Sequence, residues 1–444
     1  MTVSAPKQAK RTGSHIALAI ALLCGSAVGL TAFADTAHAQ RKKDKKNKAG
    51  KPDYSKGFVA AYTPLNTLSQ DPAADAAALK AGVPGVVAAM ETADDKLAGG
   101  GLIYNIGIAT KDLKLQRQAL DMMLNSGKLP ADRLEQYILT AGQLASDDGD
   151  FAAARKMFMR AIAGGYSGSP GLEGVIAESY FDEEKYAEGL AYLKDEIEKK
   201  KSAGLLPDEG WLRRGVAVAY TNDLAREAVV LSAEYARLYP STTSWGDAIA
   251  IQRNYFDYDN NAMLDLLRLA DRTGSLRDGR DYADYIESAD ARRLPGEVKR
   301  VAAAGVAAGL LESNDPFVVE AQSIASQRLA ADKADLPALE RDARKSSSTA
   351  LTATAAGDAM LSYGMSAKAE EMYMIASNKS GADMPRVLTR LGIAQADQGK
   401  NQEAAATFAK VTGVRGPIAT LWSIYAEQNA APVADTAESA ASAM

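Results

Sequence analysis

The sequence has almost no histidine or cysteine. It contains two histidines and one cysteine in 444 residues, and all three, His15, Cys24 and His38, lie within the first 39 residues. Residues 40–444 therefore cannot supply Ser-His-Asp or Cys-His catalysis, a disulfide, or a zinc site built from histidine and cysteine. Any metal would need oxygen ligands alone. We therefore expect a binding protein with no enzyme activity, no cofactor and no metal site.

The sequence also lacks an uninterrupted apolar run long enough for a membrane span, which needs about 20 residues. The apolar run at 16–30 is broken by Gly25, Ser26 and Gly29, follows a basic segment, and precedes the small residues of Ala37-His38-Ala39. This order is typical of a secretory signal peptide over residues 1–39. An uncleaved anchor and a lipoprotein cleaved at Cys24 are the alternatives. We expect an exported protein of the periplasm, with the outer-membrane surface as a second location.

Charge is unevenly distributed along the chain. The whole sequence has a net charge of −5, yet residues 41–56 carry eight lysines and arginines against two aspartates. Without apolar periodicity, this stretch predicts a basic disordered leader over 40–57. It could be a solvated spacer or could contact an anionic envelope surface. Because the rest of the chain is acidic and export is expected, we do not expect nucleic acid as a partner.

The sequence has no sustained alternation of apolar and polar residues of the kind that predicts β-strands. A different pattern recurs, in which a glycine is followed twelve residues later by an alanine. Two pairs of these glycines are 35 residues apart, which is typical of helical-hairpin repeats. We expect the small residues to let the two helices of a hairpin approach without side chains between them. The glycines are Gly107, Gly142, Gly357 and Gly392, followed by Ala119, Ala154, Ala369 and Ala404.

The strongest repeats add an aromatic residue and a further small or apolar residue after the alanine. A fourth repeat has a thirteen-residue gap from glycine to alanine. The residues are Phe158 and Ala161, Tyr373 and Ala376, Phe408 and Val411, and in the fourth repeat Trp211, Gly215, Ala228 and Pro240. This pattern resembles the tetratricopeptide repeat family. The resemblance implies an all-α fold, a right-handed α-solenoid of antiparallel helix hairpins, closed by a C-terminal capping helix near Trp422.

The repeats divide the chain unevenly. We expect an N-terminal array over 58–245, irregular helical repeats or a separate subdomain over 246–347, and C-terminal repeats with the capping helix over 348–429. The alanine-rich segment 430–444 lacks large apolar residues and predicts a disordered tail.

Members of the resembled family bind extended peptides or partner helices in a groove lined by the first helix of each hairpin. The resemblance therefore implies a non-catalytic scaffold that binds a protein or peptide of the cell envelope. The family's lysine and asparagine clamp for a C-terminal carboxylate is not reproduced here. The groove candidates are Lys111, Gln136, Gln143, Glu178, Phe181, Tyr220, Asp358, Arg386 and Thr389.

Two other functions are weighed against the scaffold. Tyr255, Tyr258, Tyr282 and Tyr285 stand beside acidic residues, a composition suited to a carbohydrate or cell-wall polymer binding module, and equally to the edge of a helical core. A carboxylate-dependent hydrolase needs two carboxyls that face one cleft, and no such pair is evident.

A calcium loop begins to match at Asp257, Asp259 and Asn261. The match fails where Ala262 and Arg268 replace the required glycine and glutamate. We therefore expect no calcium site there.

Overall fold

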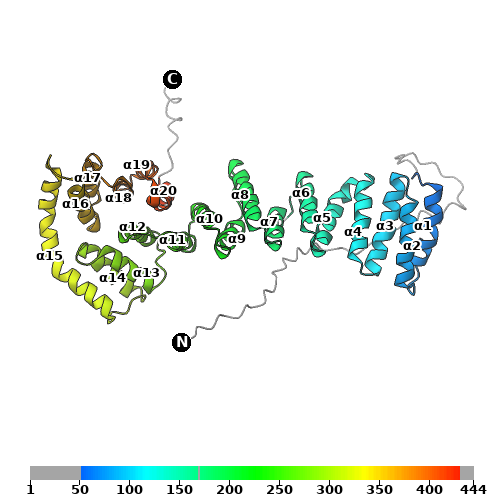
Figure 1. Cartoon of the computed structure of the whole chain (residues 1–444), viewed down its shortest axis with the longest axis horizontal. Helices are drawn as coiled ribbons and strands as arrows, with labels where there is room; N and C mark the ends of the chain where they lie inside the picture. The colour runs from blue at the N-terminus through cyan, green and yellow to red at the C-terminus, as the bar shows by residue number, and fades with distance from the viewer. Residues whose placement is uncertain (1–51, 169–170, 431–444) are drawn as a thin grey trace, which may run out of the picture. The chain divides into compact units, whose positions relative to one another are not determined.

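The computed structural model describes residues 52–168 and 171–430, and over these ranges the fold is all-α with no strand. The helices are labelled in Figure 1. The expected signal peptide, most of the basic leader, and the tail from 431 lie outside the described residues. Among the described helices, none is long and apolar enough to cross a membrane.

The helices follow one another with short turns between them. In chain order they are α1 (Lys56–Ser69), α2 (Ala76–Ala88), α3 (Ala93–Ala109), α4 (Leu113–Asn125), α5 (Ala131–Asp147), α6 (Phe151–Ala163), α7 (Leu172–Asp182), α8 (Tyr186–Ser202), α9 (Glu209–Thr221), α10 (Ala225–Leu238), α11 (Thr242–Tyr255), α12 (Asn260–Arg272), α13 (Gly279–Ala289), α14 (Pro295–Ala307), α15 (Pro316–Arg344), α16 (Ala350–Ser362), α17 (Ser366–Ser377), α18 (Met384–Ala396), α19 (Asn401–Phe408) and α20 (Gly416–Asn429), with a 3-10 turn at Gly413–Arg415.

Local sequence explains where the hairpins turn. Gly149, Gly364 and Gly399 each lie seven residues after a repeat glycine and adopt φ values of 78°, 70° and 75°, a region that glycine enters without steric cost. After the first of these turns, Asp150 caps α6 by accepting a hydrogen bond from the backbone nitrogen of Ala153 at 3.1 Å. Three of the expected hairpins therefore turn at a glycine in a fixed position of the repeat, whereas Lys111 and Asp223 adopt the positive φ in the hairpins of Gly107 and Gly215.

The packing role of the repeat glycines differs from the expectation. A side chain does lie between the paired helices in three of the four repeats, because the glycine receives the aromatic ring sixteen residues later; at Gly107 the neighbour is Gln116 of α4. A Cβ added to Gly142, Gly357 or Gly392 would stand 2.6, 2.7 or 2.5 Å from the ring of Phe158, Tyr373 or Phe408, respectively.

The same spacing holds in the irregular fourth repeat. There, a Cβ on Gly215 would meet Leu231 at 3.2 Å. Across these repeats the glycine therefore makes room for a large side chain of the second helix, which fills the space at ordinary core density.

The central region keeps packing helix against helix, although its repeat pattern is weak. α11 to α14 are 11 to 14 residues long, and α15 runs for 29 residues with Pro337 inside it. α15 contacts α14 at one end and α16 at the other. It therefore connects the irregular helices to the C-terminal repeats, and it ends at Arg344, just before the serine run 346–348.

The C-terminal helices return to the middle of the chain. α20 contacts α10 and α12, and α18 contacts α12. Gln428 donates to the carbonyl oxygen of Ala236 at 2.8 Å, and Gln252 of α11 donates to that of Pro417 at 2.9 Å. We call the contacts of α10–α12 with α18–α20 the closing interface, because they complete a circuit of packed helices from α10 to α20.

A buried ionic network lies in the closing interface. The Asp265 side chain of α12 has no exposed surface, and its carboxylate accepts from Arg390 at 3.0 Å, Arg415 at 2.5 Å and Arg268 at 3.1 Å. Arg268 is also paired with the buried Glu297 at 2.6 Å. Buried charges are tolerated only when they are paired in this way, so the network fixes which helices meet.

Trp422 is also part of this interface. It is fully buried, and its Nε1 donates to the backbone oxygen of Asp265 at 2.9 Å. Trp422 therefore packs in the interior on the last helix, α20, where the capping helix was expected.

Candidate partner-binding site

The outward face of α4 forms the floor of a hollow on the surface of the described residues. Its residues at 114, 117, 118, 121, 122 and 125 repeat with a spacing of three and four, so they share one face of the helix. The opposite face holds the buried residues Ala119, Leu120 and Met123. α4 is thereby fixed to the core on one side and presents a mixed polar and methionine face on the other.

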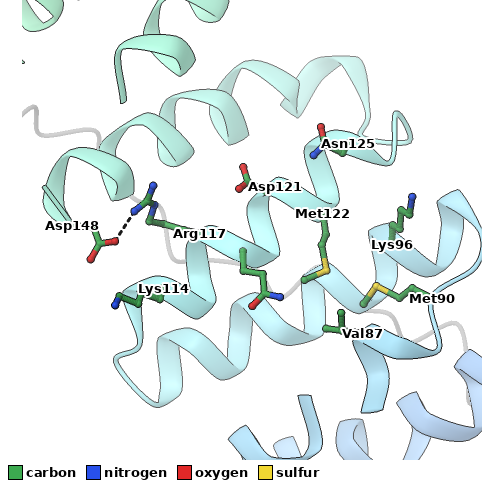
Figure 2. A pocket seen from close by; sticks show the side chains of 10 residues that line it. Val87, Met90, Lys96, Lys114, Arg117, Asp121, Met122, Asn125 and Asp148 are labelled. Carbon is green, nitrogen blue, oxygen red and sulfur yellow. Dashed lines mark hydrogen bonds and ion pairs between the residues drawn. The ribbon is translucent and has the colours of Figure 1, made fainter. Parts of the chain in front are cut away.

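Two adjoining hollows of about 620 and 600 Å³ lie along this face and share Asp121 and Asn125 in their walls. We call them together the α4 hollow. The first is lined by Val87, Met90, Lys96, Lys114, Arg117, Gln118, Asp121, Met122, Asn125 and Asp148 (Figure 2). The second continues to α6 through Leu124, Lys156, Met157, Met159 and Arg160. The α4 hollow therefore spans α2, α3, α4 and α6.

The first hollow has an apolar end and a charged end. In Figure 2, Val87, Met90 and Met122 lie at one end with Lys96 beside Met90, and Lys114 lies with the Arg117–Asp148 pair at the other. Methionine is flexible and polarisable, which suits it to surfaces that adapt to different apolar groups. Met159 of the second hollow is 40% exposed, so it adds accessible apolar area beside the lysines.

Arg117 is held in place by two carboxylates at the turn between α5 and α6. Its guanidinium donates to Asp148 at 2.5 Å and also pairs with Asp150. The hydrogen bond to Asp150, followed by that to Asp148, raises the pKa of Arg117, and the same bond lowers the pKa of Asp150. Because Asp150 is also the N-cap of α6, the arginine links α4 to the start of the next hairpin.

The other cations of the α4 hollow have no acidic partner among the described residues. Lys96, Lys114, Lys156 and Arg160 form no ion pair there, and the only unpaired carboxylate in the lining is Asp121. The surface therefore combines methionine side chains with an excess of positive charge. Such a surface is complementary to a ligand that has apolar groups and carboxylates.

No cluster of side chains suited to a metal ion occurs in the described part of the chain. No group of three or more acidic residues is placed to hold a metal ion there. In the incomplete calcium motif, Asp259 caps α12 at the nitrogen of Ala262, and Asn261 accepts from Arg293.

The nine groove candidates occupy different environments. Lys111 lies in the α3–α4 turn with φ 52°. Gln136 of α5 is exposed, and Gln143 donates to Asp147 at 2.8 Å. Glu178 of α7 pairs with Arg214 at 2.7 Å, and Tyr220 of α9 is 45% exposed.

The remaining candidates are largely in the interior. Phe181 is buried, with Gly189 leaving room for its ring, and Thr389 is buried with its hydroxyl donating to Pro385. These two side chains are therefore not available to a partner. Asp358 and Arg386 are brought together at 2.6 Å, at the edge of the buried ionic network.

The four tyrosines of the carbohydrate alternative do not form one exposed platform. Tyr285 and Tyr258 are buried, and Tyr285 donates to Glu297 at 2.9 Å while Tyr258 donates to Gln252 at 3.2 Å. Tyr282 packs partly buried against the core of the irregular helices, and Tyr255 donates to the carbonyl oxygen of Tyr220 at 3.4 Å. Burial at the edge of a helical core accounts for at least two of them.

The sequence interpretation missed the residues of the α4 hollow because it followed the resembled family to the first helix of each hairpin. α4 and α6 are second helices. The available signal was the second face of α4, where polar and methionine residues recur at helical spacing opposite the buried Ala119, Leu120 and Met123.

Comparison with protein-family models and with characterised proteins gives no match for this chain.

Proposed function

We propose that this protein is a non-catalytic, exported helical-repeat scaffold that binds a protein or peptide partner of the bacterial cell envelope in the α4 hollow. The observation that carries the proposal is the coincidence of methionines with four cations that lack acidic partners in the described residues. On an ordinary protein surface, positive and negative charges are interspersed. In the α4 hollow, carboxylates of a bound ligand would balance the excess of positive charge.

The partner implied by this chemistry is a segment with apolar side chains and nearby carboxylates. Its apolar groups would displace water from Met90 and Met122, and its carboxylates would meet Lys114 at one end and Lys156 at the other. The two adjoining hollows provide a continuous surface for a peptide longer than a few residues. Exposed ion pairs each contribute little, so the apolar contacts are expected to supply most of the affinity.

The proposal also includes export to the periplasm and a solenoid architecture. The signal-like pattern in residues 1–39 supports transport to the periplasm, and the basic segment 41–56 supports contact with an anionic envelope surface. The glycine turns and ring contacts, which occur in one hairpin of the N-terminal array and in both C-terminal repeats, support a right-handed solenoid of the tetratricopeptide type.

Photo-crosslinking in cells tests the proposal. A photoreactive residue in place of the exposed Gln118 should form a discrete crosslinked species with an envelope protein. The double variant Lys114→Glu/Lys156→Glu should lose this species, because two attractive charges become repulsive.

A matched control separates the site from overall charge. Lys194 and Lys410 are exposed and have no ion pair among the described residues, so Lys194→Glu/Lys410→Glu makes the same change in net charge elsewhere. The proposal requires the control to retain crosslinking. Equal loss in both double variants, or no species above the background of an unlabelled chain, would refute it.

A further inference from the structure

Three arginines converge at one edge of the closing interface. Arg386 and Arg390, on one face of α18, both donate to the same oxygen of Asp358, each at 2.6 Å. Arg293, in the turn between α13 and α14, donates to the side chain of Asn261 at 2.7 Å, and Arg390 donates to the backbone oxygen of the same residue at 3.2 Å. Asn261 and Asp358 thus link the three arginines through a continuous chain of hydrogen bonds.

Positive charge is in excess in this cluster. Asp358 is the one carboxylate that contacts two of its arginines, and its other oxygen is occupied by the hydroxyl of Tyr373 at 2.8 Å. Arg390 also reaches Asp265, but that carboxylate is shared with two further arginines. Arg293 has no ion pair among the described residues. Its positive charge is therefore not neutralised by a neighbouring side chain.

Arg386 has donor capacity that is not used. Its Nε is shielded from solvent and has no hydrogen-bond acceptor among the described residues. Leaving a donor of a charged group unsatisfied is costly, so an acceptor that reached this atom would be stabilised. Arg293 is exposed, which gives such an acceptor a route to the cluster.

The electrostatic environment of Arg293 agrees with this geometry. Surrounding protein atoms displace water from its guanidinium and lower its pKa, and the positive charges of Arg390, Arg386 and Arg268 lower it further. The negative charge of Asp358 acts in the opposite direction and raises the pKa of Arg293. An added negative charge would relieve this repulsion.

We propose that Arg293 and Arg386, backed by Arg390, bind an oxyanionic group, either a carboxylate or a phosphate. A guanidinium presents its donors in a planar fork that matches the oxygens of both groups. Because Arg293 belongs to the α13–α14 turn and Arg386 to α18, the bound anion bridges two segments of the circuit and strengthens the closing interface. This site is separate from the α4 hollow and does not depend on the function proposed for it.

Anion-dependent thermal stability of the purified full-length chain tests the site. Inorganic phosphate and acetate are titrated separately, with sodium chloride at matched ionic strength as the reference. The expected result is that at least one of the two oxyanions raises Tm above the chloride reference. A response to phosphate alone identifies a phosphate site, whereas a response to acetate identifies a carboxylate site.

Two single variants make the test specific. Arg293→Gln keeps a hydrogen-bond donor for Asn261 but removes the positive charge. The variant should need about tenfold more anion than the wild type for the same rise in Tm. The neighbouring Arg292 is exposed and has no ion pair among the described residues, so Arg292→Gln should keep the full response. Arg386→Lys, which retains charge but loses the fork, should weaken it without unfolding the chain.

The proposal fails in either of two outcomes. In the first, chloride raises Tm as much as phosphate and acetate do. In the second, Arg292→Gln reduces the response as much as Arg293→Gln. If the cluster had only a structural role, neither phosphate nor acetate would raise the Tm of the wild type above the chloride reference. In that case Arg293→Gln would be at least as stable as the wild type in plain buffer, because the substitution removes repulsion between like charges.

Discussion

The buried carboxylate of Asp265 is predicted to hold the closing interface together, and Asp265→Asn tests this role. The substitution keeps the size and shape of the side chain and removes its charge. Asp265 has no exposed surface and accepts hydrogen bonds from Arg268, Arg390 and Arg415. Two of these donors come from segments at least 125 residues away along the chain. The change therefore acts directly on the contacts that complete the circuit.

The expected cost follows from what each arginine retains. Arg268 keeps Glu297 and Arg390 keeps Asp358, but Arg415 loses its only carboxylate among the described residues. Removing one partner of a buried ion pair costs about 3–5 kcal/mol. Since two of the three cations keep a partner, we expect about 3 kcal/mol, at the lower end of that range.

Hydrogen exchange followed by mass spectrometry locates the effect. Amides of α12, α18 and α20 that open with the closing interface should exchange about 100-fold faster in Asp265→Asn, because about 1.4 kcal/mol corresponds to each factor of ten. Amides of α4 and α6 should be unchanged. Asp247→Asn is the control, because Asp247 makes only a surface pair with Arg277 at 3.0 Å, worth at most about 1 kcal/mol.

The reasoning would be refuted if Asp265→Asn changed exchange no more than Asp247→Asn. It would also be refuted if the acceleration were spread evenly over α4, α6 and α20.

Three further outcomes are expected. The arginines around Asp265 outweigh its burial and hold its pKa at about 2, below an unfolded value of about 4. Its stabilising contribution is therefore complete above about pH 4 and lost as pH falls towards 2, and acid titration of exchange in α18 should be shallower in Asp265→Asn than in the wild type. Gly142→Ala should destabilise the chain by about 1–3 kcal/mol in urea unfolding, because the added Cβ would overlap Phe158. The control Gly101→Ala, whose Cβ would have nothing within 4 Å, should be neutral or stabilising by up to about 1 kcal/mol. Equal effects of the two substitutions would contradict the packing of Phe158 over Gly142. Phe158→Ala should cost about 3–5 kcal/mol in the same assay by opening a cavity, and a loss below about 1 kcal/mol would show that the ring is not a core element.

The helical hairpins could be predicted from the sequence because their determinants are local. A glycine, an alanine twelve residues later and a glycine turn between them lie within one repeat, so spacing alone reveals them. Phe158, whose ring fills the space over Gly142, was also part of the sequence pattern, sixteen residues after the glycine. Its contact with the glycine was not predicted, because spacing identifies helix faces but not the direction of a side chain across the hairpin.

The closing interface could not be predicted in this way. Its contacts join residues 125 to 192 positions apart, such as Arg390 with Asp265 and Gln428 with Ala236. Arginines and aspartates in sequence look like solvated charges, because charged residues are rarely buried. Only their placement in three dimensions shows that they pair inside the protein.

The α4 hollow was missed for a different reason. Lys114, Met122 and Lys156 form no motif, and they belong to second helices, whereas the family resemblance drew attention to first helices. The significance of the two lysines comes from the absence of acidic partners for them among the described residues. Such a property is not visible in the sequence.

The most direct test of the proposed function is the affinity of the crosslinked partner for purified wild type and for the two double lysine variants at several salt concentrations. The account predicts that Lys114→Glu/Lys156→Glu binds at least about tenfold more weakly and with a smaller salt dependence, because it removes two complementary charges from the site. It predicts that Lys194→Glu/Lys410→Glu binds within about twofold of the wild type. Equal affinity in all three proteins would contradict the assignment of the α4 hollow as the binding site.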